Sequence, residues 1–225
     1  MEGDFFSCGY YDPVLRSPPD RLTYAYSISA TKVAIGKAYA LIFPHCVNCL
    51  QTHTMAINKA LIAEIQQEAQ STKKILERIP AEHFGWKPHE KSMSLGTLAT
   101  HLANLAGWIS ITIEQDELDL AGDMKRFVPS TTEDLVAHYN EGIENAVRVL
   151  ETTTDETMMQ PWTLKKGAHV IMTQPKIVVL RSMCLNHMVH HRGQLTVYLR
   201  LLNIPVPGVY GPSADDLAAM AASSN

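Results

Sequence analysis

Apolar residues recur at steps of three and four along four long stretches of this chain, and this period constrains its fold more than any other feature. The stretches run over residues 56–79, 95–115, 131–150 and 175–202. Each carries a single apolar stripe of the kind that an α-helix turns toward a core. The sequence therefore predicts four amphipathic helices. The stripes consist of Ile57, Leu61, Ile65, Ile75 and Ile79; Leu98, Leu102, Leu105 and Ile109; Leu135, Tyr139, Ile143, Val147 and Leu150; and Ile177, Leu180, Cys184, Leu195, Tyr198 and Leu202.

Local signals support these helices and what lies between them. Ser94 can cap the second helix, and Ser130 with Glu133 predicts a capping box at the start of the third. Before the last helix, residues 162–172 predict a small β-hairpin that turns at Gly167. Four amphipathic helices of this length in one small domain predict an all-α fold. The expected architecture is an antiparallel four-helix bundle with a small hairpin before the last helix.

Residues 1–54 show neither this period nor an internal repeat. Their longest apolar run, Val33–Phe43, is interrupted by Lys37 and is too short to span a bilayer. They also lack the basic region and the cleavage site of a signal peptide. We therefore predict an irregular N-terminal extension over 1–54 without a packed core, a helical domain over 55–225, and no membrane partner.

The net charge and the cysteine positions narrow the expected partners and the cellular location of the protein. The formal net charge is −4 and no basic cluster is present, so nucleic acid is not an expected partner. Three of the four cysteines lie in the first fifty residues, a layout unlike the disulfide framework of a secreted protein. This distribution predicts a reducing cytoplasm. The pair Cys46 and Cys49, with His45 and His53 beside it, is only a weak zinc signal.

Three histidines stand within five positions of the last predicted helix. Steps of three and four along its apolar stripe pass through His187 and His191. These two rings are therefore expected on the buried face, one turn apart. His190 turns toward one flank, and His101 borders the stripe of the second helix.

Three imidazoles from two helices can form a His₃ set. Such a set binds a divalent metal and leaves a position open for water or substrate. Without a metal, each buried ring needs hydrogen-bond partners for two nitrogens. A single histidine on an apolar face is nevertheless more often a core residue than a ligand. From spacing alone, a metal site and ordinary core packing both remain open.

Other polar residues fall at predicted buried positions. Glu68 lies on the first stripe, at about the level of His101 if the two helices run antiparallel. A carboxylate there would orient a ligand imidazole or move a proton, whereas a rotated stripe would leave it in solvent. Tyr198 is the second weak catalytic candidate, with core packing favoured over substrate contact. Arg192 is expected to form an ion pair at a helix or dimer surface.

Two stretches of the chain resemble a known family. They are "IPAEHFGWKPHEKSMSLGTLATHLANLAGW" and "NHMVHHRGQLTVYLRLLNIPVPGVYGPSAD". They are similar to the DinB/YfiT-like superfamily of damage-inducible metalloproteins, and the resemblance covers residues 55–216. The His-x-x-x-His followed by Arg-Gly-Gln-Leu is its most specific part. The resemblance implies an antiparallel four-helix bundle, often a homodimer. It also implies one divalent ion per chain (zinc, nickel or similar), with His101, His187 and His191 as the ligands.

Activity transfers less readily than fold. Some members of the superfamily resemble thiol-S-transferases that use a low-molecular-weight thiol. The expected function is therefore a metal-dependent enzyme of that type, acting on small electrophiles. A metal-dependent hydrolase and a non-catalytic, metal-stabilised stress-response protein are the alternatives. An open coordination position favours an enzyme, and a fourth protein ligand favours the non-catalytic protein.

Overall fold

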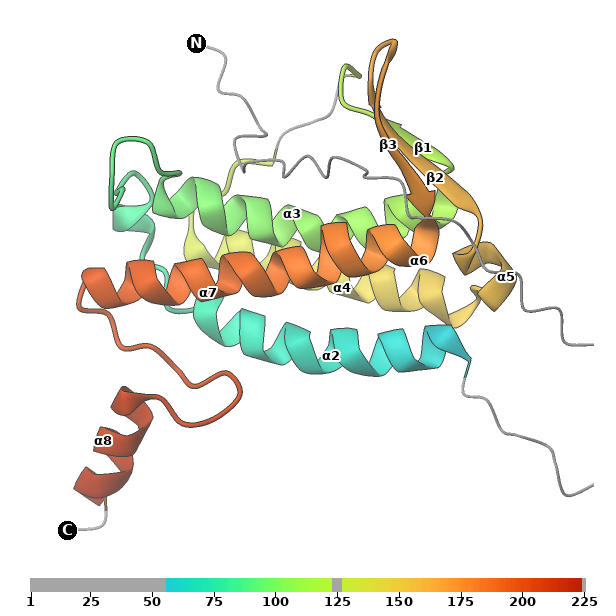
Figure 1. Ribbon diagram of the computed structural model, residues 1–225. Coiled ribbons are helices and arrows are strands. Elements are labelled where there is room, and N and C mark those ends of the chain that lie inside the picture. The colour runs from blue at the N-terminus through green and yellow to red at the C-terminus, as the bar shows by residue number, and fades with distance from the viewer. Residues whose placement is uncertain (1–55, 123–126, 224–225) are drawn as a thin grey trace, which may run out of the picture. The chain divides into compact units, whose positions relative to one another are not determined.

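The computed structural model describes residues 56–122 and 127–223 (Figure 1). The predicted extension over 1–54, its weak zinc motif and the expected domain boundary at 55 lie outside the described residues. The described part is mostly helical and carries one small β-sheet. None of its helices combines the length and the apolar character needed to cross a membrane.

Helices form at all four predicted stretches. The fourth is one continuous run that contains a π-helical segment, η3. This segment was not predicted, because a three-and-four period does not report a locally widened turn. The bounds are Ile57–Leu76 (α2), Leu95–Glu114 (α3), Thr132–Glu151 (α4), Lys176–Val179 (α6), Leu180–Leu185 (η3) and Asn186–Leu201 (α7).

The long helices α2, α3, α4 and α7 lie side by side (Figure 1). α3 contacts α4 and α7, and α2 contacts the same two helices. Their apolar stripes meet in one core, in which Leu102, Leu135 and Leu195 have no exposed surface. α3 and α4 approach closely at Gly142, where a Cβ atom would lie 2.8 Å from the Cβ of Ala106. A larger residue at position 142 would therefore push these two helices apart.

A three-stranded sheet in the order β1-β2-β3 lies beside the C-terminal end of α3 (Figure 1). β2 (Pro161–Lys166) and β3 (His169–Pro175) pair antiparallel, which confirms the predicted hairpin. Its turn contains Gly167 at φ 60°, in the left-handed region that favours glycine. β1 (Glu117–Asp119) pairs with β2 in parallel and was not predicted. Three residues are too few to show a period, and this pairing depends on a strand far along the chain.

Shorter helical segments complete the described structure. The carboxylate of Asp155, in α5, accepts a hydrogen bond from the backbone N–H of Ile57 (3.0 Å), which ties α5 to the start of α2. Asp215, in α8, forms an ion pair with Arg200 of α7. The bounds of these segments are Ala81–His83 (η2), Asp155–Met158 (α5) and Ala214–Ser223 (α8).

The caps of α3 and α4 test the predicted helix starts. Ser94 Oγ accepts from Thr97 N–H (3.2 Å), as expected. The predicted capping box over Ser130 and Glu133 is wrong by one residue. Thr131 and Asp134 form it instead, each accepting the other's backbone N–H at 3.0 Å. The sequence Ser-Thr-Thr-Glu-Asp allows both registers, and the structure adopts the one that begins at Thr131.

Lys176 anchors the end of α3 to α6. Its side chain is 4% exposed, although it carries a charge. The ammonium donates to the carbonyl oxygens of Ile113 (2.9 Å) and Gln115 (2.8 Å) and lies 3.1 Å from a carboxylate oxygen of Asp116. It therefore pairs with carbonyls at the C-terminus of a helix, where a cation is favoured.

Replacing Lys176 with Met should lower the free energy of unfolding by about 1–3 kcal/mol, because both carbonyl oxygens lose their donor in a largely dry environment. Urea denaturation followed by circular dichroism measures this change. Lys166→Met removes a lysine from the exposed end of β2 and should change stability by less than about 0.5 kcal/mol. Equal effects of the two variants would contradict the role given to Lys176.

Candidate metal centre

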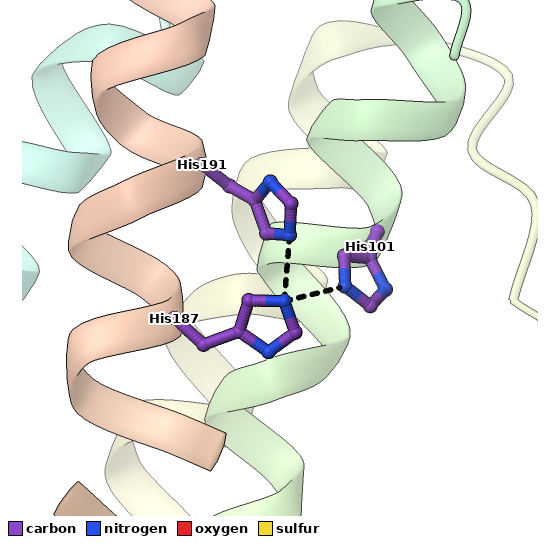
Figure 2. A group of neighbouring side chains, drawn as sticks. All are labelled: His101, His187 and His191. Carbon is purple, nitrogen blue, oxygen red and sulfur yellow. Dashed lines mark hydrogen bonds between the residues drawn. The ribbon is translucent and has the colours of Figure 1, made fainter. Parts of the chain in front are cut away.

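The structure brings His101, His187 and His191 together from α3 and α7 (Figure 2). The Nε2 atom of His187 lies 2.8 Å from that of His191 and 3.5 Å from that of His101. One nitrogen from each ring falls within 4.8 Å of the other two. Among the described residues this is the group of three or more histidines, cysteines or carboxylates that could hold a metal ion.

The helical period explains how these rings reach one place. His187 and His191 are four residues apart, so they project from the same face of α7 one turn apart. Leu195 continues that face into the core, and Leu98 and Leu105 do the same beside His101 on α3. His191 is 3% exposed, whereas His101 and His187 are half-buried. The group therefore lies at the border of the core, with part of it within reach of solvent.

A hydrogen bond to the backbone orients the ring of His187 as in a metal-bound histidine. Its Nδ1 lies 3.3 Å from the backbone carbonyl oxygen of Met183. A carbonyl oxygen only accepts, so Nδ1 carries the proton and donates it. The Nε2 atom is then left with a free lone pair that points at the other two rings. Metal-bound histidines commonly show this arrangement, in which one nitrogen donates to a carbonyl and the other faces the ion.

Burial keeps the three rings in the neutral form that binds metals. Desolvation, followed by the neighbouring rings of His191 and His187, lowers the pKa of His101 to about 4. Desolvation also lowers the pKa of His191 to about 4, although the hydrogen bond that His191 donates to Gln194 acts in the opposite direction. The pKa of His187 is lowered mainly by burial. All three rings are consequently neutral near pH 7, and no proton has to leave them before a metal binds.

The donor set fits a divalent transition metal. Neutral imidazole is a ligand that zinc, nickel and copper share, whereas magnesium and calcium prefer oxygen. Within residues 56–122 and 127–223, no fourth histidine, cysteine or carboxylate joins the group. Three such ligands could therefore hold an ion with coordination positions left for another molecule.

Cys184 precedes His187 by one turn but has no exposed surface. Burial raises the pKa of its thiol to about 12. The thiol is therefore protonated at neutral pH and packs as a small apolar residue. Residues 56–122 and 127–223 contain no other cysteine, so the described part of the chain supplies no reactive thiol to this site.

Glu68 lies in a different cluster from the histidines. Its Oε2 atom is 2.6 Å from a guanidinium nitrogen of Arg192 and accepts a hydrogen bond from the Tyr210 hydroxyl (3.0 Å). Arg192 also donates to Thr72 Oγ1 (3.2 Å) and to the Tyr210 hydroxyl. Glu68 therefore pairs with Arg192 and Tyr210. These contacts do not place its carboxylate beside the imidazoles.

The surface position predicted for Arg192 is wrong, because its side chain is only 2% exposed. The stripe of α7 is wide enough to bury Arg192 beside His191, where the carboxylate of Glu68 balances its charge. Tyr210, which was not predicted, joins this cluster from the segment after α7. No helical period extends to that segment, so its docking could not be predicted.

The remaining candidates fall beside the site. Tyr198 stacks edge-on against Trp86, with ring centroids 5.6 Å apart, and its hydroxyl donates to the carbonyl oxygen of Met93 (3.3 Å). These contacts agree with a packing role. His190 is exposed and does not join the converging group, although its ring centroid lies 5.0 Å from that of His191. Gln194, which contacts His191, was missed, although its i, i+3 spacing was a usable signal.

Comparisons with known proteins agree with this fold. YrdA, an uncharacterized protein of Bacillus subtilis (strain 168), is 28% identical over 152 residues, which are 67% of this chain and 86% of YrdA. A solved DinB-like protein from Bacillus cereus ATCC 10987 is 25% identical, with a TM-score of 0.51, over 64% of this chain and 92% of its own.

A second solved structure, the DinB-like protein YjoA from Bacillus subtilis, has a TM-score of 0.51 at 20% identity. It covers 67% of this chain and 96% of its own, and at this identity it shows the fold alone. The model of the DinB family matches residues 51–223, which is most of the length of the sequence. The chain therefore belongs to the DinB family.

Proposed function

We propose that this protein binds one divalent metal ion through His101, His187 and His191 and uses it to transfer a low-molecular-weight thiol to a small electrophile. The observation that carries the metal site is the convergence of three neutral rings, with the Nε2 atoms of His187 and His191 only 2.8 Å apart. Bare lone pairs at such a distance repel each other, and a cation between them removes the repulsion. Zinc and nickel suit this ligand set.

The arrangement of the four long helices is part of what we propose. We interpret α2, α3, α4 and α7 as an antiparallel four-helix bundle, supported by the contacts of α2 and α3 with both α4 and α7. Ligands from α3 and α7 would then lie on facing helices, as they do in other metal-binding bundles. We also propose a homodimer, which size-exclusion chromatography with light scattering would test.

The chain's own residues favour a transferase over a hydrolase. When bound, a divalent ion acts as a Lewis acid and lowers the pKa of a thiol or water molecule that it coordinates. A hydrolase commonly places a general base within hydrogen-bond reach of the attacking water. Among the described residues no carboxylate joins the three histidines, and Glu68 is held by Arg192. A thiol substrate also suits the reducing cytoplasm that we propose as the location.

The experiment that tests this function uses the full chain. The purified protein is loaded with zinc or nickel and offered glutathione, cysteine and related thiols with a chloronitrobenzene electrophile. Hydrolysis of nitrophenyl acetate is measured in parallel. Thiol-dependent turnover that disappears on chelation and in His101→Ala would support the transferase. Metal-dependent ester hydrolysis alone would favour a hydrolase, and a metal-loaded protein without turnover would favour a metal-stabilised, non-catalytic protein.

A further inference from the structure

A polar side chain on α7 contacts the histidine group without belonging to it. Gln194 follows His191 by three residues on α7, so both project from the same side of that helix. The Oε1 atom of Gln194 lies 2.7 Å from Nδ1 of His191. An amide oxygen only accepts hydrogen bonds, so in this contact Nδ1 of His191 carries the proton.

This contact decides which nitrogen of His191 is free. With the proton on Nδ1, the Nε2 atom has an unprotonated lone pair, and that atom is the one 2.8 Å from Nε2 of His187. In the opposite tautomer a proton would occupy the space between the two rings. That ring could not donate its Nε2 lone pair to an ion until the proton moved.

The two ligands on α7 obtain the same tautomer from different partners. His187 donates to a backbone carbonyl, that of Met183, which no side-chain substitution removes. His191 depends on a side chain, that of Gln194. A single side-chain substitution can therefore remove the partner that fixes the tautomer of His191, but not the partner of His187.

We infer that Gln194 is a positioning residue of the metal centre, which holds His191 in the Nδ1-protonated tautomer and directs its Nε2 atom at the ion. The inference rests on the proposed metal binding and deepens it. Partners of this kind behind a ligand histidine raise metal affinity by about 10- to 100-fold. Gln194 does not contact the ion, so its effect passes through His191.

Two substitutions at this position have opposite expected effects. Gln194→Met keeps the length and the helix propensity of the side chain but removes the strong acceptor, so zinc should bind about 10- to 100-fold more weakly. Gln194→Glu keeps an acceptor oxygen and adds a negative charge, so zinc should bind at least as tightly as to the wild type. A purely structural role would not order the variants in this way.

Zinc affinity is measured on the full chain by competition with a chromophoric chelator, with Gln67→Met as the matched control on the exposed face of α2. The tautomer of His191 is measured separately, by long-range ¹H–¹⁵N spectra of the metal-free protein. The wild type should show protonated Nδ1, and Gln194→Met should show a mixture of tautomers. Zinc affinity of Gln194→Met within about threefold of the wild type, or a tenfold weaker Gln194→Glu, would overturn the inference alone. A wild-type chain that binds no zinc would overturn the proposed function and this inference together.

Discussion

The His187→Ala variant should lose most of the divalent metal that the wild-type chain retains. His187 is the central ring of the group, with its Nε2 atom 2.8 Å from that of His191 and 3.5 Å from that of His101. Its removal leaves two imidazoles, which is fewer protein ligands than stable zinc sites have. Elemental analysis after desalting should show a fall from about one ion per chain to near zero. His191→Ala should behave in the same way.

His190→Ala is the matched control for this experiment, since it removes an imidazole from the same helix. His190 is exposed and does not join the converging group, so its variant should keep the metal content of the wild type. Circular dichroism establishes that each variant is folded. Equal metal content in the wild type and in a folded His187→Ala would show that the rings are only packed together, and the proposed activity would lose its basis.

The second large effect is expected on stability. Arg192→Met should lower the free energy of unfolding by about 3 kcal/mol, because it breaks a largely buried ion pair from one side. The side chain of Arg192 is 2% exposed, and that of its partner Glu68 is 19% exposed. Removing the guanidinium leaves the Glu68 carboxylate with little water to replace it. The Tyr210 hydroxyl, which also accepts a hydrogen bond from Arg192, loses that donor as well.

Denaturant unfolding of the metal-free protein measures this effect without a contribution from metal binding. Arg200→Met serves as the control on the same helix, since Arg200 pairs with Asp215 at 51% side-chain exposure and this exposed pair should contribute little to stability. Adding Glu68→Gln to Arg192→Met should recover part of the loss, because it removes the unpaired charge. A loss in Arg192→Met no larger than in Arg200→Met would contradict the buried ion pair.

The four long helical stretches could be predicted because their signal is local. A stripe at three- and four-residue steps depends only on the period of the helix. The same period placed His187 and His191 on one face of α7, and His101 beside the stripe of α3. The hairpin was also predictable, because Gly167 marks its turn. Each of these features depends on residues that are close together in the sequence.

Other features were missed or misplaced because they depend on residues far apart in the chain. The parallel strand β1, for example, depends on its pairing with β2, more than forty positions along the chain. Arg192 and Glu68, whose backbone carbonyl also accepts from the guanidinium, are 124 positions apart. The burial of this pair follows from how α2 and α7 are rotated against each other, which neither helix specifies alone.

The sequence by itself determined the helices of this protein and which of their faces are apolar, since hydrophobic burial acts on any helix with such a stripe. Only the tertiary structure decided that His101, 86 positions from His187, comes within 3.5 Å of it. It also decided that Glu68 pairs with Arg192 rather than with an imidazole. The reason is geometric: a helical period sets the direction of a side chain about its own axis, whereas the rotation and offset of packed helices set which side chains meet.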